Sequence, residues 1–214
     1  MNINPHAKKV LCYGDSNTWG YMPFTEERYP VDMRWTGLLQ SLLGEGYWVI
    51  EEGFNGRTTN LEDPDSPGKN GLQYFYPCLR THNPMDLVVL MLGTNDTKFK
   101  FHRSAEDITA GIKLLLQEIH QTAWNRNGET PAVLLLAPPL VDDSVELARD
   151  EFVGAAEKTA LLPALYQQLA REFGAHFADV SHWVSPSPKD GIHLEPADHR
   201  TIAENLREII TQIN

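Results

Sequence analysis

Short apolar segments alternate with longer segments of helical period along the whole chain, and this alternation limits the fold more than any other feature. Regular strand and helix alternation predicts repeated βαβ units and therefore a parallel sheet. Several of the short segments are apolar on both faces, as strands are when helices cover both sides of their sheet. We therefore predict an α/β protein with the architecture of a three-layer α/β/α sandwich.

Five strands and five helices are expected in strict alternation. The chain of 214 residues has room for one domain, so we assign residues 1–214 to a single domain. Three connecting segments are long, and each follows the carboxyl end of an expected strand, the edge at which open α/β sheets bind ligands. The expected strands are 8–13, 47–51, 86–92, 132–137 and 176–180, the expected helices are 34–43, 71–82, 105–124, 154–173 and 196–213, and the long segments are 20–33, 60–70 and 138–153.

The charge balance excludes several classes of partner. The chain has 29 acidic and 18 basic residues, a net charge of −11, which disfavours nucleic acid and anionic membrane surfaces. No apolar run approaches the ~20 residues of a membrane span, and the amino terminus shows no signal-peptide pattern, so we expect a cytoplasmic protein.

Cys12 and Cys78 lack zinc-site spacing and are expected to be buried thiols, and no histidine pattern predicts a metal or a cofactor.

Four polar motifs fall where the expected strands end. They are Gly14-Asp15-Ser16-Asn17-Thr18, Gly53-Phe54-Asn55-Gly56-Arg57, Gly93-Thr94-Asn95-Asp96 and Asp190-Gly191-Ile192-His193. Each motif alone is explained by a turn or a helix cap, because Gly, Asn, Asp and Ser are common in both. All four together are far less expected by chance, because their side chains would converge at one edge of the sheet.

In these motifs the sequence resembles the SGNH (GDSL-type) hydrolases, from Lys8 to the final helix. The finer match is to small bacterial arylesterases and acyltransferases, from which the segment Phe54-Asn55-Gly56 departs. The resemblance implies a flavodoxin-like five-stranded parallel sheet of order 2-1-3-4-5, no cofactor, and hydrolysis of short-chain acyl esters. It also implies that acyl transfer to alcohols or hydrogen peroxide, and assembly into homo-oligomers, occur in this branch. The finer match lies in residues 12–20, 34–37, 51–53, 57–60 and 91–98.

Acyl transfer assigns a role to each of three side chains. A serine hydroxyl is a weak nucleophile, so Ser16 needs a base that takes its proton. His193 suits that role because an imidazole exchanges protons near neutral pH. Asp190 would then hold the imidazole in the required tautomer. By resemblance, the backbone N–H groups of Ser16 and Gly56 and the side-chain amide of Asn95 form the oxyanion hole.

The substrate pocket is less well marked. Asn17, Trp19, Phe54 and Ile192 are candidates for its lining, although Trp19 and Ile192 fit the core equally well. We expect Trp35 in the core, Asp15 in a structural role and Lys98 in solvent.

Two other kinds of function are compatible with parts of the sequence. A thioesterase, a lysophospholipase or a carbohydrate acetylesterase would use the same three side chains, and the sequence separates these poorly. A flavodoxin-like nucleotide-binding module would instead use residues 14–18 as a phosphate loop. Asp15 and the absence of glycine-rich phosphate motifs argue against the module. We expect a small acyl ester as the partner.

Overall fold

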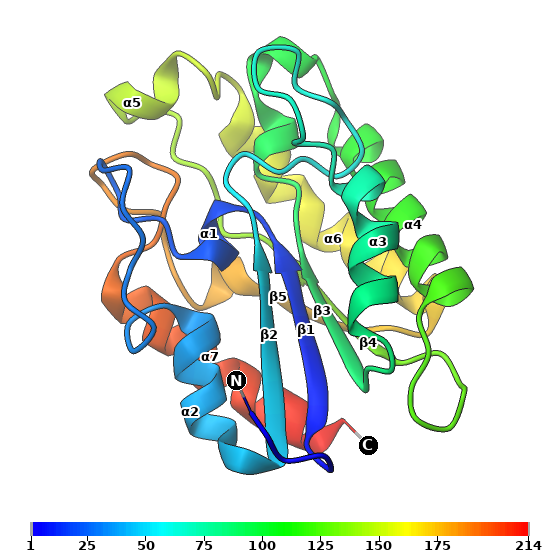
Figure 1. Cartoon of the computed structure of the whole chain (residues 1–214). Coiled ribbons are helices and arrows are strands. Elements are labelled where there is room, and N and C mark those ends of the chain that lie inside the picture. Colours follow the sequence, from blue (N-terminus) through cyan, green and yellow to red (C-terminus); the bar gives the residue numbers. More distant parts are fainter. Residues whose placement is uncertain (1, 214) are drawn as a thin grey trace.

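The sheet of the protein is fully parallel, with the strand order β2-β1-β3-β4-β5 (Figure 1). This computed structural model describes residues 2–213. The predicted strand order 2-1-3-4-5 is therefore confirmed. The strands are β1 (Lys8–Gly14), β2 (Tyr47–Gly53), β3 (Leu87–Met91), β4 (Ala132–Ala137) and β5 (His176–Asp179).

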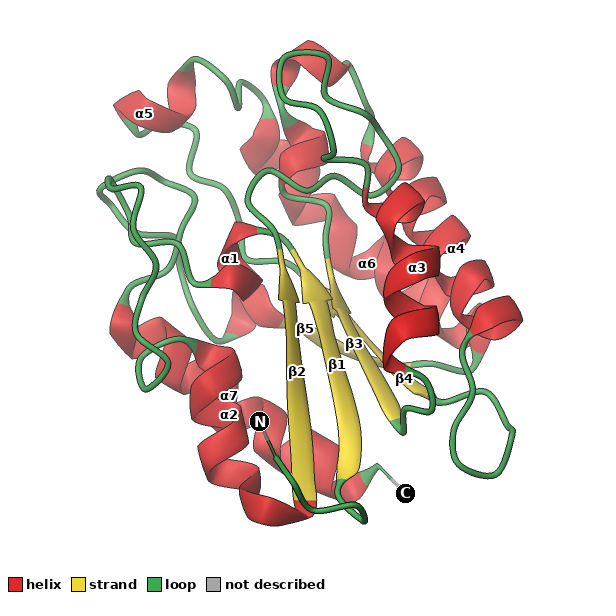
Figure 2. Ribbon diagram, viewed as in Figure 1, coloured by secondary structure: helices red, strands yellow, loops and turns green. Residues whose placement is uncertain are grey.

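Helices cover both faces of the sheet, which confirms the three-layer sandwich (Figure 2). The helices α2 (Trp35–Leu43) and α7 (Pro196–Gln212) pack on one face. The opposite face is covered by α3 (Gly71–His82), α4 (Ala105–Thr122) and α6 (Ala155–Phe173). Within residues 2–213, none of the helices is long and apolar enough to cross a membrane.

The side chains of β1 illustrate why the sheet needs both layers. Val10 and Cys12 belong to the core under α2 and α7, whereas Leu11 and Tyr13 belong to the core under α3, α4 and α6. Successive side chains of a strand point to opposite faces, so an apolar run is buried only when both faces are covered. Trp35 is 1% exposed in the first of these cores, as expected.

Two short helices, α1 (Ser16–Trp19) and α5 (Glu146–Arg149), were not predicted. Each has four residues, too few for a helical period to be visible in the sequence. The strands β1 and β2 also run farther than expected, because Gly14 and Gly53 continue the pairing although a glycine carries no apolar signal. A Cβ atom on Gly53 would lie 2.2 Å from the backbone nitrogen of Trp19, so only glycine lets α1 pack against β2.

Glu51 on β2 bonds to the long segment 20–33, through Arg28, and to the residues that directly follow it. Its carboxylate accepts hydrogen bonds from Arg34 at 2.7 Å, Arg28 at 2.9 Å and Thr36 at 2.8 Å. Although burial acts to raise the pKa of Glu51, the hydrogen bonds from Arg34 and Thr36 hold it below its ordinary value. The long segment after α1 is therefore held above the carboxyl edge by charge-assisted hydrogen bonds.

His199 joins α7 to the beginning of α2. It is fully buried, its Nδ1 accepts a hydrogen bond from the backbone N–H of Trp35 at 3.3 Å, and its ring meets Tyr29 edge-on. Burial, with a smaller contribution from His193, lowers the pKa of His199 from 6.5 to about 4. Protonation would remove the acceptor of the Trp35 N–H and place a charge in the core.

We predict that His199 makes the fold sensitive to acid. Because its pKa is lower in the folded protein than in the unfolded chain, its contribution to stability is complete above pH 6.5 and is lost as the pH falls toward 4. The shift from 6.5 to about 4 corresponds to about 3 kcal/mol. Urea titrations should show that the free energy of unfolding of the parent protein falls by about this additional amount between pH 7 and pH 4. The free energy of unfolding of His199→Asn should not show this additional decrease. Parallel pH profiles of the two proteins would contradict the prediction.

Candidate active site

Ser16 begins α1, directly beyond the end of β1. Asp15 caps this short helix, because its Oδ1 accepts the backbone N–H of Asn17 at 3.0 Å. The turn leaves Ser16 only 6% exposed. Among residues 2–213, no group accepts a hydrogen bond from the N–H of Ser16. The hydroxyl and the unpaired backbone N–H of Ser16 therefore both lie at the carboxyl edge of the sheet.

Asp190 and His193 lie in the connection between β5 and α7. Asp190 Oδ1 accepts the backbone N–H groups of Ile192 at 3.0 Å and His193 at 2.9 Å, and Asp190 Oδ2 lies 2.7 Å from His193 Nδ1. Burial acts to raise the pKa of Asp190, but the hydrogen bonds from His193 and from these amides hold it below its ordinary value. The carboxylate is thus charged at neutral pH and fixes the imidazole ring.

His193 connects the segment before α7 with the turn after β1. Its Nε2 lies 3.0 Å from Ser16 Oγ, although the two residues are 177 positions apart. The ring of Tyr21 stacks on the ring of His193, with the two centroids 4.3 Å apart. This arrangement can move a proton from the Ser16 hydroxyl to an imidazole whose far nitrogen is already bonded to a carboxylate.

Within residues 2–213, the carboxylate of Asp15 forms no hydrogen bond to Ser16, Asp190 or His193. Asp15 is 1% exposed, and burial raises its pKa to about 6, against the opposing effects of the Asn17 amide and of His193. Its bond to Asn17 matches the structural role expected from the sequence.

Gly56 and Asn95 line the same cavity as Ser16 and His193. Gly56 has a φ of 75°, a conformation that a side chain would strain, and within residues 2–213 its N–H has no acceptor. The side-chain amide of Asn95 donates to the carbonyl oxygen of Arg57 at 3.1 Å, which fixes the orientation of the amide. The structure therefore brings together all five residues predicted for the relay and the oxyanion hole.

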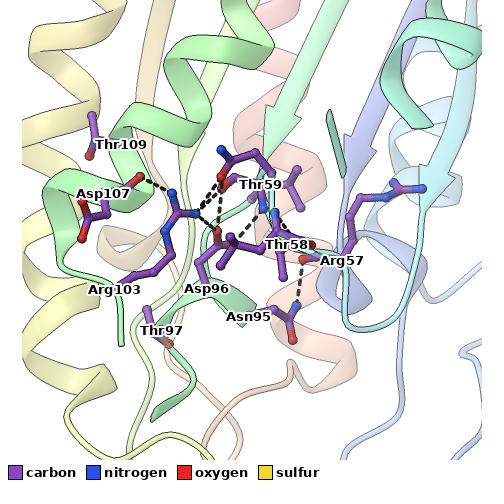
Figure 3. A network of polar contacts seen from close by, with 12 residues as sticks. Arg57, Thr58, Thr59, Asn95, Asp96, Thr97, Arg103, Asp107 and Thr109 are labelled. Carbon is purple, nitrogen blue, oxygen red and sulfur yellow. Dashed lines mark hydrogen bonds and ion pairs between the residues drawn. The ribbon is translucent and has the colours of Figure 1, made fainter. Parts of the chain in front are cut away.

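A buried network holds the turns that carry these donors (Figure 3). Asp96 is fully buried and accepts the Thr59 N–H at 2.9 Å and Arg103 Nη1 at 2.7 Å. Burial raises the pKa of Asp96, although hydrogen bonds from Thr59 and Arg103 oppose this effect. Arg57 adds a second connection, because its guanidinium donates to the carbonyl oxygen of Gly14 at 2.8 Å. The turns after β1, β2 and β3 are thus tied to one another.

The cavity beside Ser16 has a volume of about 280 Å³. Ile192 lines it, as the sequence suggested. Asn17, Trp19 and Phe54 do not line it. The side-chain amide of Asn17 bonds to the carbonyl oxygen of Ile192. Trp19 packs against Tyr21 and Arg28. Phe54 lines a different cavity, which Tyr74 of α3 also lines. A larger cavity of about 870 Å³ lies against α2 and shares no residue with this one.

Sequence analysis missed several residues of this cavity, and it was wrong about Lys98. Instead of extending into solvent, Lys98 lines the cavity and forms an ion pair with Glu151 at 2.6 Å, with 17% of its side chain exposed. Tyr21 also lines the cavity. Leu147, Glu151 and Phe152 come from the segment that contains α5. No motif marked Tyr21, Leu147, Glu151 or Phe152, which belong to the long segments 20–33 and 138–153. Lys98 follows the third motif closely, but its direction depends on the ion pair with Glu151, which the sequence does not show.

Comparison with known proteins gives a consistent result. Residues 12–212 match the model of the GDSL-like Lipase/Acylhydrolase family. The structure superposes on the aryl esterase of M. smegmatis with a TM-score of 0.91, 39% identity, and coverage of 97% of this chain and 100% of that chain. A carbohydrate acetylesterase from Sinorhizobium meliloti gives a TM-score of 0.89, 36% identity, and coverage of 97% and 100%.

A curated relative is an acetylxylan esterase from Xylanibacter ruminicola. It is 26% identical over 234 aligned positions that cover 95% of this chain. The match extends over 43% of the relative, so this chain spans less than half of the length of that protein.

We predict that the Asp96–Arg103 pair is essential to the stability of the sheet edge. Arg103→Ala would leave Asp96 buried without its cation and should lower the free energy of unfolding by about 3 to 5 kcal/mol in urea titrations. The matched control is Lys113→Ala, which removes the exposed ion pair with Glu172 and should cost less than about 1 kcal/mol. Equal effects of the two substitutions would contradict the importance assigned to Arg103.

Proposed function

This chain belongs to the GDSL-like lipase/acylhydrolase family and is an ester hydrolase, and we propose that it cleaves short-chain acyl esters through an acyl-enzyme on Ser16. One observation carries the proposal: Asp190 Oδ2, His193 and Ser16 Oγ form a continuous series with contacts of 2.7 Å and 3.0 Å. Both distances are those of hydrogen bonds, and the 3.0 Å contact lies within the range at which a positioned base accepts a proton.

The first half of the reaction forms the acyl-enzyme. Ser16 Oγ attacks the ester carbonyl carbon while His193 Nε2 takes the hydroxyl proton, and Asp190 stabilises the imidazolium that results. The carbon–oxygen bond to the leaving alcohol then breaks, and His193 returns the proton to that alkoxide. In the second half, water attacks the acyl group after giving its proton to His193, and Ser16 Oγ leaves with that proton.

Three donors are assigned to the charge that develops on the carbonyl oxygen. They are the N–H groups of Ser16 and Gly56 and the Nδ2 amide of Asn95. Their support is that all three residues line one cavity and that the two N–H groups have no acceptor within residues 2–213. Donors held in place before the reaction stabilise the transition state without reorganisation.

The size of the cavity favours a short acyl group. About 280 Å³ is at the lower limit of ordinary ligand sites, and Leu147, Phe152 and Ile192 provide its apolar surface. A long acyl chain, as in a lysophospholipase substrate, would need an extended apolar groove in the same place. An acetyl group needs very little of this surface.

A carbohydrate acetyl ester is the second candidate substrate. Lys98, Glu151 and Asn55 line the same cavity and offer charged and amide groups that can bond to sugar hydroxyls. The names of two relatives, a carbohydrate acetylesterase and an acetylxylan esterase, support this choice. Acyl transfer is a further extension, since an alcohol or hydrogen peroxide that reaches the acyl-enzyme would compete with water for deprotonation by His193.

The proposal predicts that hydrolysis depends on Ser16 and on chain length. With p-nitrophenyl esters from acetate to palmitate, turnover should fall steeply beyond butyrate, and Ser16→Ala should lower kcat on the order of 10⁶-fold. Ser144→Ala, which changes an exposed serine, is the control and should be fully active. Full activity of Ser16→Ala would refute the assignment, and a preference for palmitate would refute the short-chain substrate.

The oxyanion hole yields a second prediction. Asn95→Ala should lower kcat by about 10² to 10³, because one donor to the developing oxyanion is lost, while KM changes little. The measurement is steady-state hydrolysis of p-nitrophenyl acetate, accompanied by urea unfolding to verify that the variant is folded. A folded Asn95→Ala enzyme with the kcat of the parent would remove Asn95 from the mechanism.

A further inference from the structure

A second group of reactive side chains lies between β2 and α3. Within residues 2–213, Glu52, Cys78 and His82 form the one group of three His, Cys, Asp or Glu residues whose ligand atoms all lie within 4.8 Å of one another. None of the three lines the cavity beside Ser16. We propose that Glu52, Cys78 and His82 bind a zinc ion at a site separate from the catalytic residues.

The secondary structure places these three side chains together. Cys78 and His82 are four residues apart on α3, so they occupy neighbouring positions on one face of the helix. Glu52 lies on β2 beside Glu51, and successive strand residues face opposite sides. Glu51 bonds to Arg34 on the α2 side, so Glu52 faces α3. The cluster is therefore a consequence of helix and strand period, not of a mobile surface loop.

The donor set suits zinc in particular. Thiolate sulfur, imidazole nitrogen and carboxylate oxygen are the three ligand types found in zinc sites, whereas magnesium and calcium prefer oxygen alone. Three protein ligands leave one tetrahedral position for water. Cys78 is 1% exposed, and the side chains of Glu52 and His82 are about one-fifth exposed, so the site would bind the ion at the edge of the core.

The three ligand atoms, all within 4.8 Å of one another, have to adjust their separations to bind an ion. Ligand atoms in a tetrahedral zinc site lie ~3.3–3.8 Å apart, given bonds of ~2.0–2.3 Å. His82 Nε2 and Glu52 Oε1 are 2.8 Å apart and would have to separate by about half an ångström. The hydroxyl of Tyr74, one turn before Cys78, lies 3.3 Å from Glu52 Oε2 and would orient the carboxylate from outside.

An ion can reach the site from solvent, and its binding displaces protons from the ligands. Glu52 and Tyr74 line a cavity of about 510 Å³, through which an ion and its water can approach. On binding, the thiol proton of Cys78 leaves to solvent. Binding also requires the His82 tautomer whose proton is on Nδ1, so that Nε2, which lies 2.8 Å from Glu52 Oε1, is free to bind the ion.

Cobalt is the probe that tests this inference, because Co²⁺ replaces zinc and absorbs light. The protein is prepared without a polyhistidine tag, treated with chelator, and titrated with Co²⁺. We expect a sulfur-to-cobalt charge-transfer band in the near ultraviolet and tetrahedral bands in the visible, saturating at one ion per chain and abolished by Zn²⁺. Absence of the charge-transfer band would overturn the proposal.

Variants locate the ion. Cys78→Ser should remove the charge-transfer band, and His82→Gln, at a partly exposed position, should keep the fold and weaken Co²⁺ binding about tenfold or more. The controls are Cys12→Ala, which changes the other buried thiol, and His182→Gln, which changes a histidine paired with Asp179 without a thiol. Both should bind Co²⁺ like the parent. A band that persists in Cys78→Ser, or unchanged affinity in His82→Gln, would overturn the assignment.

Discussion

The carboxyl edge of the sheet is a buried polar layer, and its groups must find their hydrogen-bond partners inside the protein. Asp15, Asp96 and Arg57 are each at most 3% exposed there, where an unpaired charge would cost several kcal/mol. Arg57 and Asp96 each bond to a backbone group of a neighbouring turn, and Asp15 bonds to the backbone of Asn17 within its own turn. The turns are therefore held rigidly, and the proposed catalytic groups lie on rigid backbone rather than on freely moving loops.

The same constraint explains how residues far apart in sequence meet. Ser16 follows β1, Gly56 follows β2 and Asn95 follows β3, whereas His193 lies between β5 and α7. These connections therefore place their functional groups at the same edge of the sheet. The parallel sheet determines this convergence because all of its strands end on the same side. The 3.0 Å contact between His193 and Ser16 depends on correct packing of α7, and that helix is anchored to α2 through buried His199.

The sequence predicted the position of a residue correctly where that position follows from the period of a strand or a helix. The five long helices and the convergence of Ser16 with His193 could be predicted, because apolar periodicity and motifs after strands carry that information. The strand order followed from the resemblance to the SGNH hydrolases and not from periodicity. Tyr21 could not be placed because it lies in the long segment 20–33. Lys98 could not be placed because its direction depends on a tertiary ion pair with Glu151. The Glu52, Cys78 and His82 cluster was missed for a related reason. Cys78 and His82 are four residues apart, but Glu52 comes from another element, so the sequence does not show that the three side chains meet.

The central claim is that Ser16 carries the acyl group, and covalent labelling tests it most directly. A fluorophosphonate with a short alkyl chain reacts with a serine only when a base activates that serine and donors stabilise the oxyanion-like product. We expect inactivation in proportion to label, with mass spectrometry of peptides placing one label per chain on Ser16. Complete inactivation with the label on another residue, or full activity after complete labelling of Ser16, would contradict the account.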